Sequence, residues 1–253
     1  MHLLLDHTFL DPIWRLVPSS FPSYPAWLVE TRSSQEKKVS YSFFSPGNTP
    51  FLLHTGLDWW SGIEALWGQW ALFHGFLQQD LPIHQGVMVF DTTKNKVAWQ
   101  DELLSFASVE GDTLWAILST GNATKIALHL HTGKEQADVP DFQAMPQPEI
   151  HTVFQEDPYF AEISDFVFQH TGHRPIRMLE YRETSQHILI SYFHPRGKLL
   201  DNFLLATMHG GTKVLHESLH LGQKGIGKGT FHEAENFLCF VKDQRRLLVY
   251  ALT

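Results

Sequence analysis

The chain has 253 residues, of which 43% are hydrophobic, and its formal net charge is −8. This length can bury a sizeable core and fits one large β domain or two small ones. A net acidic surface repels phosphate backbones, so the charge argues against general nucleic-acid binding. Aromatic side chains fit pleated, half-buried surfaces, and the 19 Phe, 8 Trp and 6 Tyr therefore favour β-structure.

The N-terminal segment and the single cysteine bear on the location of the protein. Residues 1–16 lack a charged first segment and a small-residue cleavage site, so they do not resemble a secretory signal peptide. No uninterrupted apolar segment approaches ~18 residues, and no transmembrane helix is expected. Cys239 lies in an apolar run and has no second cysteine to pair with. We expect a cytoplasmic protein that binds neither membrane nor nucleic acid.

Short runs of aliphatic, β-branched and aromatic residues, separated by Gly, Pro, Asn and Asp clusters, predict strands along most of the chain. In chain order, these strands span residues 11–16, 26–32, 39–44, 51–54, 61–67, 70–76, 87–90, 96–99, 103–109, 113–118, 125–130, 150–154, 176–182, 187–193, 203–208, 213–216, 237–241 and 247–252. Residues 61–66 could instead form a short helix, and residues 77–85 are predicted to form a loop. Residues 157–170 have apolar positions at both helical and strand spacing, and both interpretations stay open.

The spacing of the predicted hairpins suggests a repeat. They begin near residues 26, 70, 113, 187 and 236, and the first three lie 44 and 43 residues apart. A period of about 40–50 residues with about four strands per unit is typical of propeller blades. We predict an all-β, β-propeller-like fold with five or six blades of short antiparallel strands, in a single domain over residues 1–253. The alternatives are a β-sandwich, in one or several domains, and an α+β fold.

Several motifs in the first half of the chain resemble a known family. The motifs are Ile13-Trp14-Arg15-Leu16, Trp27–Arg32, Trp59-Trp60, Leu66-Trp67-Gly68, Leu72–Phe76, Asp80–Gly86, Phe90-Asp91 and Trp99. Together they resemble an uncharacterised bacterial family of similar length, called domain of unknown function 4905 and associated mainly with the Bacteroidetes. The resemblance covers mostly residues 13–100. It implies a bacterial protein but no particular activity.

Sixteen histidines raise the question of a metal site. His129 and His131 would share one face of a strand, but zinc normally needs a third and a fourth ligand. The chain has no cysteine pair and no H-E-x-x-H spacing. We interpret the pair as solvent-facing and predict no metal site and no cofactor.

Residues 222–230 nearly match a phosphate-binding P-loop. Gly222, Gly227 and Lys228 are in register, but Gly229 stands where the motif needs a hydroxyl. A P-loop also requires a strand before it and a helix after it, so that backbone N–H groups meet the phosphates. We interpret this segment as a loop between blades.

The best candidate site is the region from Trp59 to Asp91, which combines several aromatic residues with a few polar ones. Aromatic surfaces with a few polar groups can bind sugars or peptides. The candidate ligand-binding residues are Trp59, Trp60, Glu64, Trp67, His74, Asp80 and His84. The alternative is structural, with the tryptophans filling space between blades and the Asp80 and His84 side chains capping a turn.

Two functions are compatible with these residues, and a metal-dependent role for the histidines is a third possibility. The first is a non-enzymatic, propeller-like binding or scaffold protein that acts through a protein or small-ligand surface. The second is a hydrolase or lyase whose site consists of Glu64, His74, Asp80 and His84. An enzyme requires these four side chains to converge in one solvent-accessible pocket, so a structure can distinguish the two.

Overall fold

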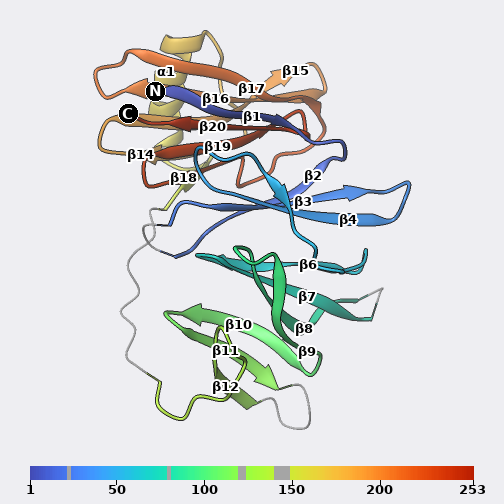
Figure 1. The fold of residues 1–253 in the computed structure, drawn as a ribbon. Helices are drawn as coiled ribbons and strands as arrows, with labels where there is room; N and C mark the ends of the chain where they lie inside the picture. The colour runs from blue at the N-terminus through green and yellow to red at the C-terminus, as the bar shows by residue number, and fades with distance from the viewer. Residues whose placement is uncertain (22–23, 79–80, 119–123, 140–148) are drawn as a thin grey trace. The chain divides into compact units, whose positions relative to one another are not determined.

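A computed structural model describes residues 1–21, 24–78, 81–118, 124–139 and 149–253 (Figure 1). These residues form twenty strands and one helix, which confirms the predicted predominance of β-structure. The chain divides into two compact units, unit 1 (Met1–Leu10 with Pro148–Thr253) and unit 2 (Asp11–Gln147). Among the described residues, no helix has both the length and the apolar character needed to cross a membrane.

Unit 2 contains three antiparallel sheets, and in each sheet the strands lie side by side in chain order. The first sheet holds β2 (Ile13–Pro18), β3 (Trp27–Ser33), β4 (Lys38–Phe44) and β5 (Phe51–Leu52). The second holds β6 (Ser61–Trp67), β7 (Trp70–Gln78), β8 (Leu81–Asp91) and β9 (Lys96–Asp101). The third holds β10 (Leu104–Glu110), β11 (Thr113–Leu118) and β12 (Thr124–His129). The hairpins predicted near residues 26, 70 and 113 are the pairs β3–β4, β7–β8 and β11–β12.

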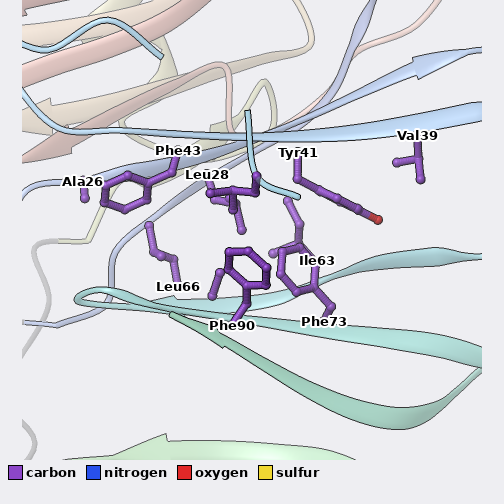
Figure 2. Close-up of a cluster of buried hydrophobic side chains, with 11 residues drawn as sticks. Ala26, Leu28, Val39, Tyr41, Phe43, Ile63, Leu66, Phe73 and Phe90 are labelled. Atoms are coloured by element: carbon purple, nitrogen blue, oxygen red, sulfur yellow. The ribbon is translucent and has the colours of Figure 1, made fainter. Parts of the chain in front are cut away.

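The middle sheet of unit 2 is buried on both faces. Alternation along β7 places Phe73 on one face and Leu72 on the other. Phe73 packs with side chains of the first sheet, including Leu28 and Tyr41, as Figure 2 shows. Leu72 packs with side chains of the third sheet, including Leu114. Each fully buried side chain of this size stabilises the fold by ~1.5–3 kcal/mol, so these two clusters hold the three sheets together.

The hairpin of β7 and β8 is longer than the sequence predicts. The loop predicted at residues 77–85 is wrong, because β7 continues to Gln78 and β8 begins at Leu81. Phe76 pairs with His84 in this extension. β9 pairs with β8 only from Val87 onward, so the earlier residues of β8 have no partner strand on that side, although the Ser105 hydroxyl donates to the His84 carbonyl at 3.2 Å. An edge strand tolerates a proline, which explains why Pro82 does not interrupt β8.

Unit 1 contains two antiparallel sheets. One holds β13 (His151–Phe154), β14 (Met178–Glu183), β15 (His187–Arg196), β16 (Leu199–Met208) and β17 (Lys213–Gln223) in chain order. The other holds β18 (Phe231–Ala234), β19 (Phe237–Lys242) and β20 (Arg246–Ala251) together with β1 (His2–Thr8), which pairs with β20. The hairpins predicted near residues 187 and 236 are β15–β16 and β19–β20.

One helix, α1 (Phe160–Thr171), settles the segment that the sequence leaves open. Its buried side chains include Phe160 and Val167, seven residues and two helical turns apart. The helix ends at Gly172, which adopts a left-handed conformation with φ 76° and donates its N–H to the Phe168 carbonyl. Side chains of α1 pack against β13–β16. The other face of the same sheet packs against β18–β20.

The described residues thus form five sheets, each a run of adjacent antiparallel strands, and β1 and β20 join the two ends of the chain in one of them. The chain between the hairpins predicted near residues 113 and 187 includes β13, a strand of the sheet of β14–β17, and α1, which packs against that sheet. The blade count, the ring and the single domain stay predictions.

Candidate functional site

Three of the predicted site residues lie side by side in the middle sheet of unit 2. Glu64 is on β6, His74 on β7 and His84 on β8, and these strands are neighbours in the sheet. The three residues are ten positions apart in sequence. Because each hairpin reverses the chain after about ten residues, this spacing brings equivalent positions next to one another.

Two β-bulges determine where these side chains point. The pairing of β6 with β7 shifts between Ile63 and Ala65, which leaves Glu64 as the extra residue. As a result, Ile63 packs into the cluster on one face of the sheet and Ala65 against the cluster on the other. The pairing of β7 with β8 shifts at His74. Bulges re-aim side chains and are frequent beside functional sites.

The Glu64 carboxylate connects the two histidines. Its Oε1 lies 2.8 Å from Nδ1 of His84, which donates a hydrogen bond, and 3.1 Å from Nδ1 of His74. The two imidazole rings stack with centroids 3.5 Å apart and planes 11° from parallel. The side chain of His74 is 3% exposed, that of Glu64 13% and that of His84 42%. The cluster therefore extends from a buried histidine to one that solvent reaches.

Neighbouring residues hold the rings in place. Phe76 packs edge-on against both rings, at 5.1 Å from His74 and 5.5 Å from His84. Gly62 pairs with His74 across β6 and β7 and adds no side chain that would displace its ring. The position of the buried ring is thus fixed by its strand, by Phe76 and by the bare backbone of Gly62.

The electrostatics of the cluster favour an ionised carboxylate. Burial raises the pKa of Glu64, but the contacts with His74 and His84 outweigh burial and hold that pKa below its usual value. One negative charge therefore lies between two imidazole groups at neutral pH. Such an arrangement can orient a histidine, accept a proton or bind a cation.

A cavity of about 390 Å³ adjoins this cluster, and His74 forms part of its wall. The remaining wall is partly apolar, with Phe73, Phe76 and Met88, and partly polar. The polar lining residues are Gln85, Gln100, Asp101 and Glu102. Sequence reasoning missed these residues and Gly62, because their proximity depends on the pairing of β7, β8 and β9. Only the register of those three strands would have identified these residues as neighbours.

The three predicted tryptophans have other contacts. The ring of Trp59 lies 5.0 Å from the guanidinium of Arg32 and 5.0 Å from the ammonium of Lys37. Trp67 is buried in the core cluster between the second and third sheets. Trp60 is 39% exposed.

Asp80, the remaining predicted site residue, lies outside the described residues. Of the four residues of the hydrolase or lyase hypothesis, the structure therefore brings together the other three.

In the P-loop-like segment, residues 222–230, a carboxylate of the chain itself accepts the hydrogen bonds that a phosphate would need. Glu180, which is 3% exposed, accepts hydrogen bonds from the backbone N–H of Gly229 at 2.7 Å and of Thr230 at 2.9 Å. The Thr230 hydroxyl donates a third, at 2.6 Å. The segment follows β17 and precedes β18, with no helix after it. Donors that a phosphate would need are therefore occupied, in agreement with the interpretation of a connecting loop.

Comparison with known families gives a match over part of the chain. The model of the family described as "Domain of unknown function (DUF4905)" matches residues 22–99, a range that includes Glu64, His74 and His84. No curated protein matches the chain. The match supports the resemblance to a domain of unknown function, and the bacterial origin stays a prediction.

Nine chains of solved structures also match. One of them, described as "Crystal structure of the eukaryotic initiation factor", has 12% identity and a TM-score of 0.34 over 97% of this chain and 54% of that chain. The chain thus spans about half the length of that protein. A similarity of this size has no bearing on function.

Proposed function

We propose that the chain is a non-enzymatic binding protein whose unit 2 binds a small ligand in the cavity beside His74. The observation that carries this proposal is the cavity itself, about 390 Å³ in volume, with a buried histidine in its wall. Ligand sites in proteins have volumes of about 300–1,000 Å³ and combine apolar walls with a few polar groups. The cavity has both properties.

The lining residues suggest what the ligand is made of. Phe73, Phe76 and Met88 offer apolar surface, which favours a compact apolar body. Asp101 and Glu102, two acidic residues, line the same cavity. Charge complementarity therefore favours a ligand that carries a cationic group, such as a small arylalkyl or alkyl amine.

Matched ligand pairs test this proposal. Ligand-observed NMR would compare phenethylamine with phenylacetate and hexylamine with hexanoate, each against the folded protein. We expect the amines to bind and the carboxylates to bind at least ~10-fold more weakly, a difference of ~1.4 kcal/mol. The double substitution Asp101→Asn with Glu102→Gln should remove the preference for amines.

A control lies in the neighbouring sheet. Glu110 is exposed at the end of β10 and does not line the cavity, so Glu110→Gln should leave amine binding unchanged. Equal binding of amines and carboxylates, or equal losses in the control and the double variant, would contradict the proposed ligand class. Binding by neither class up to millimolar concentration would contradict the proposed cavity function.

The architecture supports a binding or scaffold role through a wider surface. Five meandering antiparallel sheets, with β1 and β20 joining the chain ends, have the strand order expected for blades of a five- or six-bladed propeller. Propellers commonly serve as platforms for protein partners or small ligands. A cytoplasmic, bacterial scaffold of this kind remains our prediction, and small-angle scattering against ring and open arrangements would test its shape.

A hydrolase or lyase is the second candidate, favoured by the convergence of Glu64, His74 and His84. Glu64 accepts the Nδ1–H of His84, which leaves Nε2 of that exposed ring as a base. A carboxylate that orients a histidine in this way is common to many general-base sites. Turnover of ester, amide and phosphoester substrates that disappears in both His84→Gln and Glu64→Gln would support it. Turnover retained in both variants would refute it.

A further inference from the structure

We infer that Glu64, His74 and His84 form a binding site for one first-row divalent transition-metal ion, with Zn²⁺ as the reference ion. Of the described residues, these three form a group of His, Cys, Asp or Glu side chains whose ligand atoms all lie within 4.8 Å of one another. The inference goes beyond the small ligand proposed above, although His74 belongs to both the cluster and the cavity wall, and it is tested with metal ions alone.

The distances suit a metal ion. Zinc binds histidine nitrogen at ~2.0–2.1 Å and carboxylate oxygen at ~2.0–2.2 Å, so two ligand atoms on one tetrahedral ion lie roughly 3.3 Å apart. Oε1 of Glu64 is 2.8 Å from Nδ1 of His84 and 3.1 Å from Nδ1 of His74. The distances need shifts of only a few tenths of an ångström, but the lone pairs lie in the ring planes, so the exposed His84 ring must also turn out of its stack on His74 to face the same ion.

The buried histidine supplies an independent observation. His74 Nδ1 is inaccessible to solvent and has no hydrogen bond of acceptable geometry, although it lies close to the Glu64 carboxylate. A buried polar atom without a hydrogen bond costs ~1–3 kcal/mol and needs an explanation. A metal ion between His74 and Glu64 would provide the missing partner, because the deprotonated nitrogen would donate its lone pair to the ion.

The ligand set narrows the kind of ion. Two imidazoles and one carboxylate, with no thiolate, suit Zn²⁺, Ni²⁺, Cu²⁺ or Co²⁺ better than Mg²⁺ or Ca²⁺, which prefer all-oxygen sites. Three protein ligands leave a fourth position for solvent, as in zinc sites that remain open. The exposed ring of His84 provides the entry path. Local spacing alone predicts no metal site, because these ligands come from three strands rather than from one short motif.

Titration of the tag-free protein tests the inference. After dialysis against a chelator, isothermal titration calorimetry with ZnCl₂ near pH 7.5 should show one ion per chain with a Kd below ~10 µM. Binding should release protons, so the observed heat should change with the ionisation enthalpy of the buffer. Co²⁺ should give the intense visible absorption of a four-coordinate ion. Mg²⁺ and Ca²⁺ should not compete at equal concentration.

Matched variants show whether this cluster is the site. His84→Ala and Glu64→Gln should each weaken Zn²⁺ binding at least ~100-fold and remove the Co²⁺ absorption, since even residues outside the ligand shell contribute ~10–100-fold. His131→Ala, at an exposed histidine of the same unit, should change the affinity less than ~2-fold. Circular dichroism would confirm that each variant is folded.

Three results would overturn the inference. They are a Kd above ~10 µM for the unmodified chain, unchanged affinity in both cluster variants, and an equal loss in His131→Ala. The last result would mean that exposed histidines collect the ion without a defined site.

Discussion

Gly62 lies opposite His74 in the pairing of β6 with β7, and the imidazole ring occupies the space that a Cβ at residue 62 would need. Such a Cβ would lie 2.9 Å from both Cε1 and Nε2 of the ring. Real Cβ atoms do not approach other atoms so closely, so either the ring or the strand would have to move. The His74 ring can therefore occupy its position only because residue 62 has no side chain.

We expect Gly62→Ala to displace the His74 ring and to lower the free energy of unfolding by ~1–3 kcal/mol, the usual cost of overpacking a core. It should also weaken Zn²⁺ binding, although residue 62 offers no ligand. Urea denaturation and calorimetric titration would measure the two effects. Gly225→Ala is the control, since nothing lies within 4 Å of a Cβ there, and it should be neutral within ~0.5 kcal/mol. Similar effects of the two substitutions would show that the ring is not tightly packed.

Arg32 fixes the start of β6, which carries Glu64. Its guanidinium donates to the carbonyls of Trp59 at 2.8 Å and Ser61 at 2.6 Å, and it contacts the Glu30 carboxylate at 2.5 Å. Arg32→Lys keeps the charge but loses the planar fork, so we expect a loss of ~1–3 kcal/mol in the free energy of unfolding.

Tryptophan fluorescence should report the same change, because the guanidinium lies over the Trp59 ring. The matched control is Arg196→Lys, at an exposed side chain 3.7 Å from Asp201, which should cost less than ~0.5 kcal/mol. If chemical denaturation shows the two variants to be equally stable, the anchoring role of Arg32 is wrong.

Glu180 holds the loop at Gly229 and Thr230 by three hydrogen bonds to one buried carboxylate. Glu180→Gln removes the charge and one acceptor oxygen, and we expect the free energy of unfolding to fall by ~1.5–3 kcal/mol. Glu156→Gln, at an exposed position of the same unit, should change it by less than ~0.5 kcal/mol. Added ATP should not raise the melting temperature of the unmodified chain. A clear rise would mean that phosphate can displace the carboxylate.

Unit 1 should lose stability as the pH falls below 6.5. Burial lowers the pKa of His232 to about 4, and burial is also the main reason that the pKa values of His173, His187 and His216 are lowered. The unfolded chain takes up protons near pH 6.5 while the folded chain resists them, so stability is full above pH 6.5 and declines toward pH 4. For His232 alone this amounts to roughly 1–3 kcal/mol.

Urea denaturation at several pH values between 7.5 and 4.5 would measure this decline. His232→Gln cannot be protonated, so its stability should fall less steeply over the same range. His131→Gln, an exposed histidine in unit 2, should leave the slope of the unmodified chain unchanged. A pH-independent stability of unit 1 would contradict the expected burial of these rings.

Local patterns predict most strands because alternation and turn residues act over a few positions. The turn after β8 shows this well, since the Asp91 side chain accepts hydrogen bonds from the N–H groups of Thr93 and Lys94. Local patterns miss β1, because its pairing with β20 joins segments about 240 residues apart. The first half of β8 reads as a loop in the sequence because Pro82 and its polar neighbours resemble one.

The sequence predicts the candidate site only in part. Glu64, His74 and His84 stand out for their chemistry, but their convergence depends on two bulges and on the register of β6, β7 and β8. The bulge at Glu64 has no glycine at the shifted position, whereas the second shift contains Gly86, whose φ of 83° is the one local sign of it. Trp59 also stands out for its chemistry, but its ring packs against the guanidinium of Arg32 rather than joining the cluster. Aromatic residues serve packing as often as binding, so the residue type alone does not identify a site.

The pairing of β1 with β20 also determines the order in which the chain can fold on the ribosome. Unit 2 is continuous, from Asp11 to Gln147, and can fold as soon as it has emerged. The second sheet of unit 1 must wait until β20 is synthesised, while the residues of β1 stay unpaired. Closing a flexible loop of about 240 residues would cost roughly 5 kcal/mol, and prior folding of unit 2 shortens that loop. A circular permutant that fuses the paired ends of β20 and β1 would remove this delay.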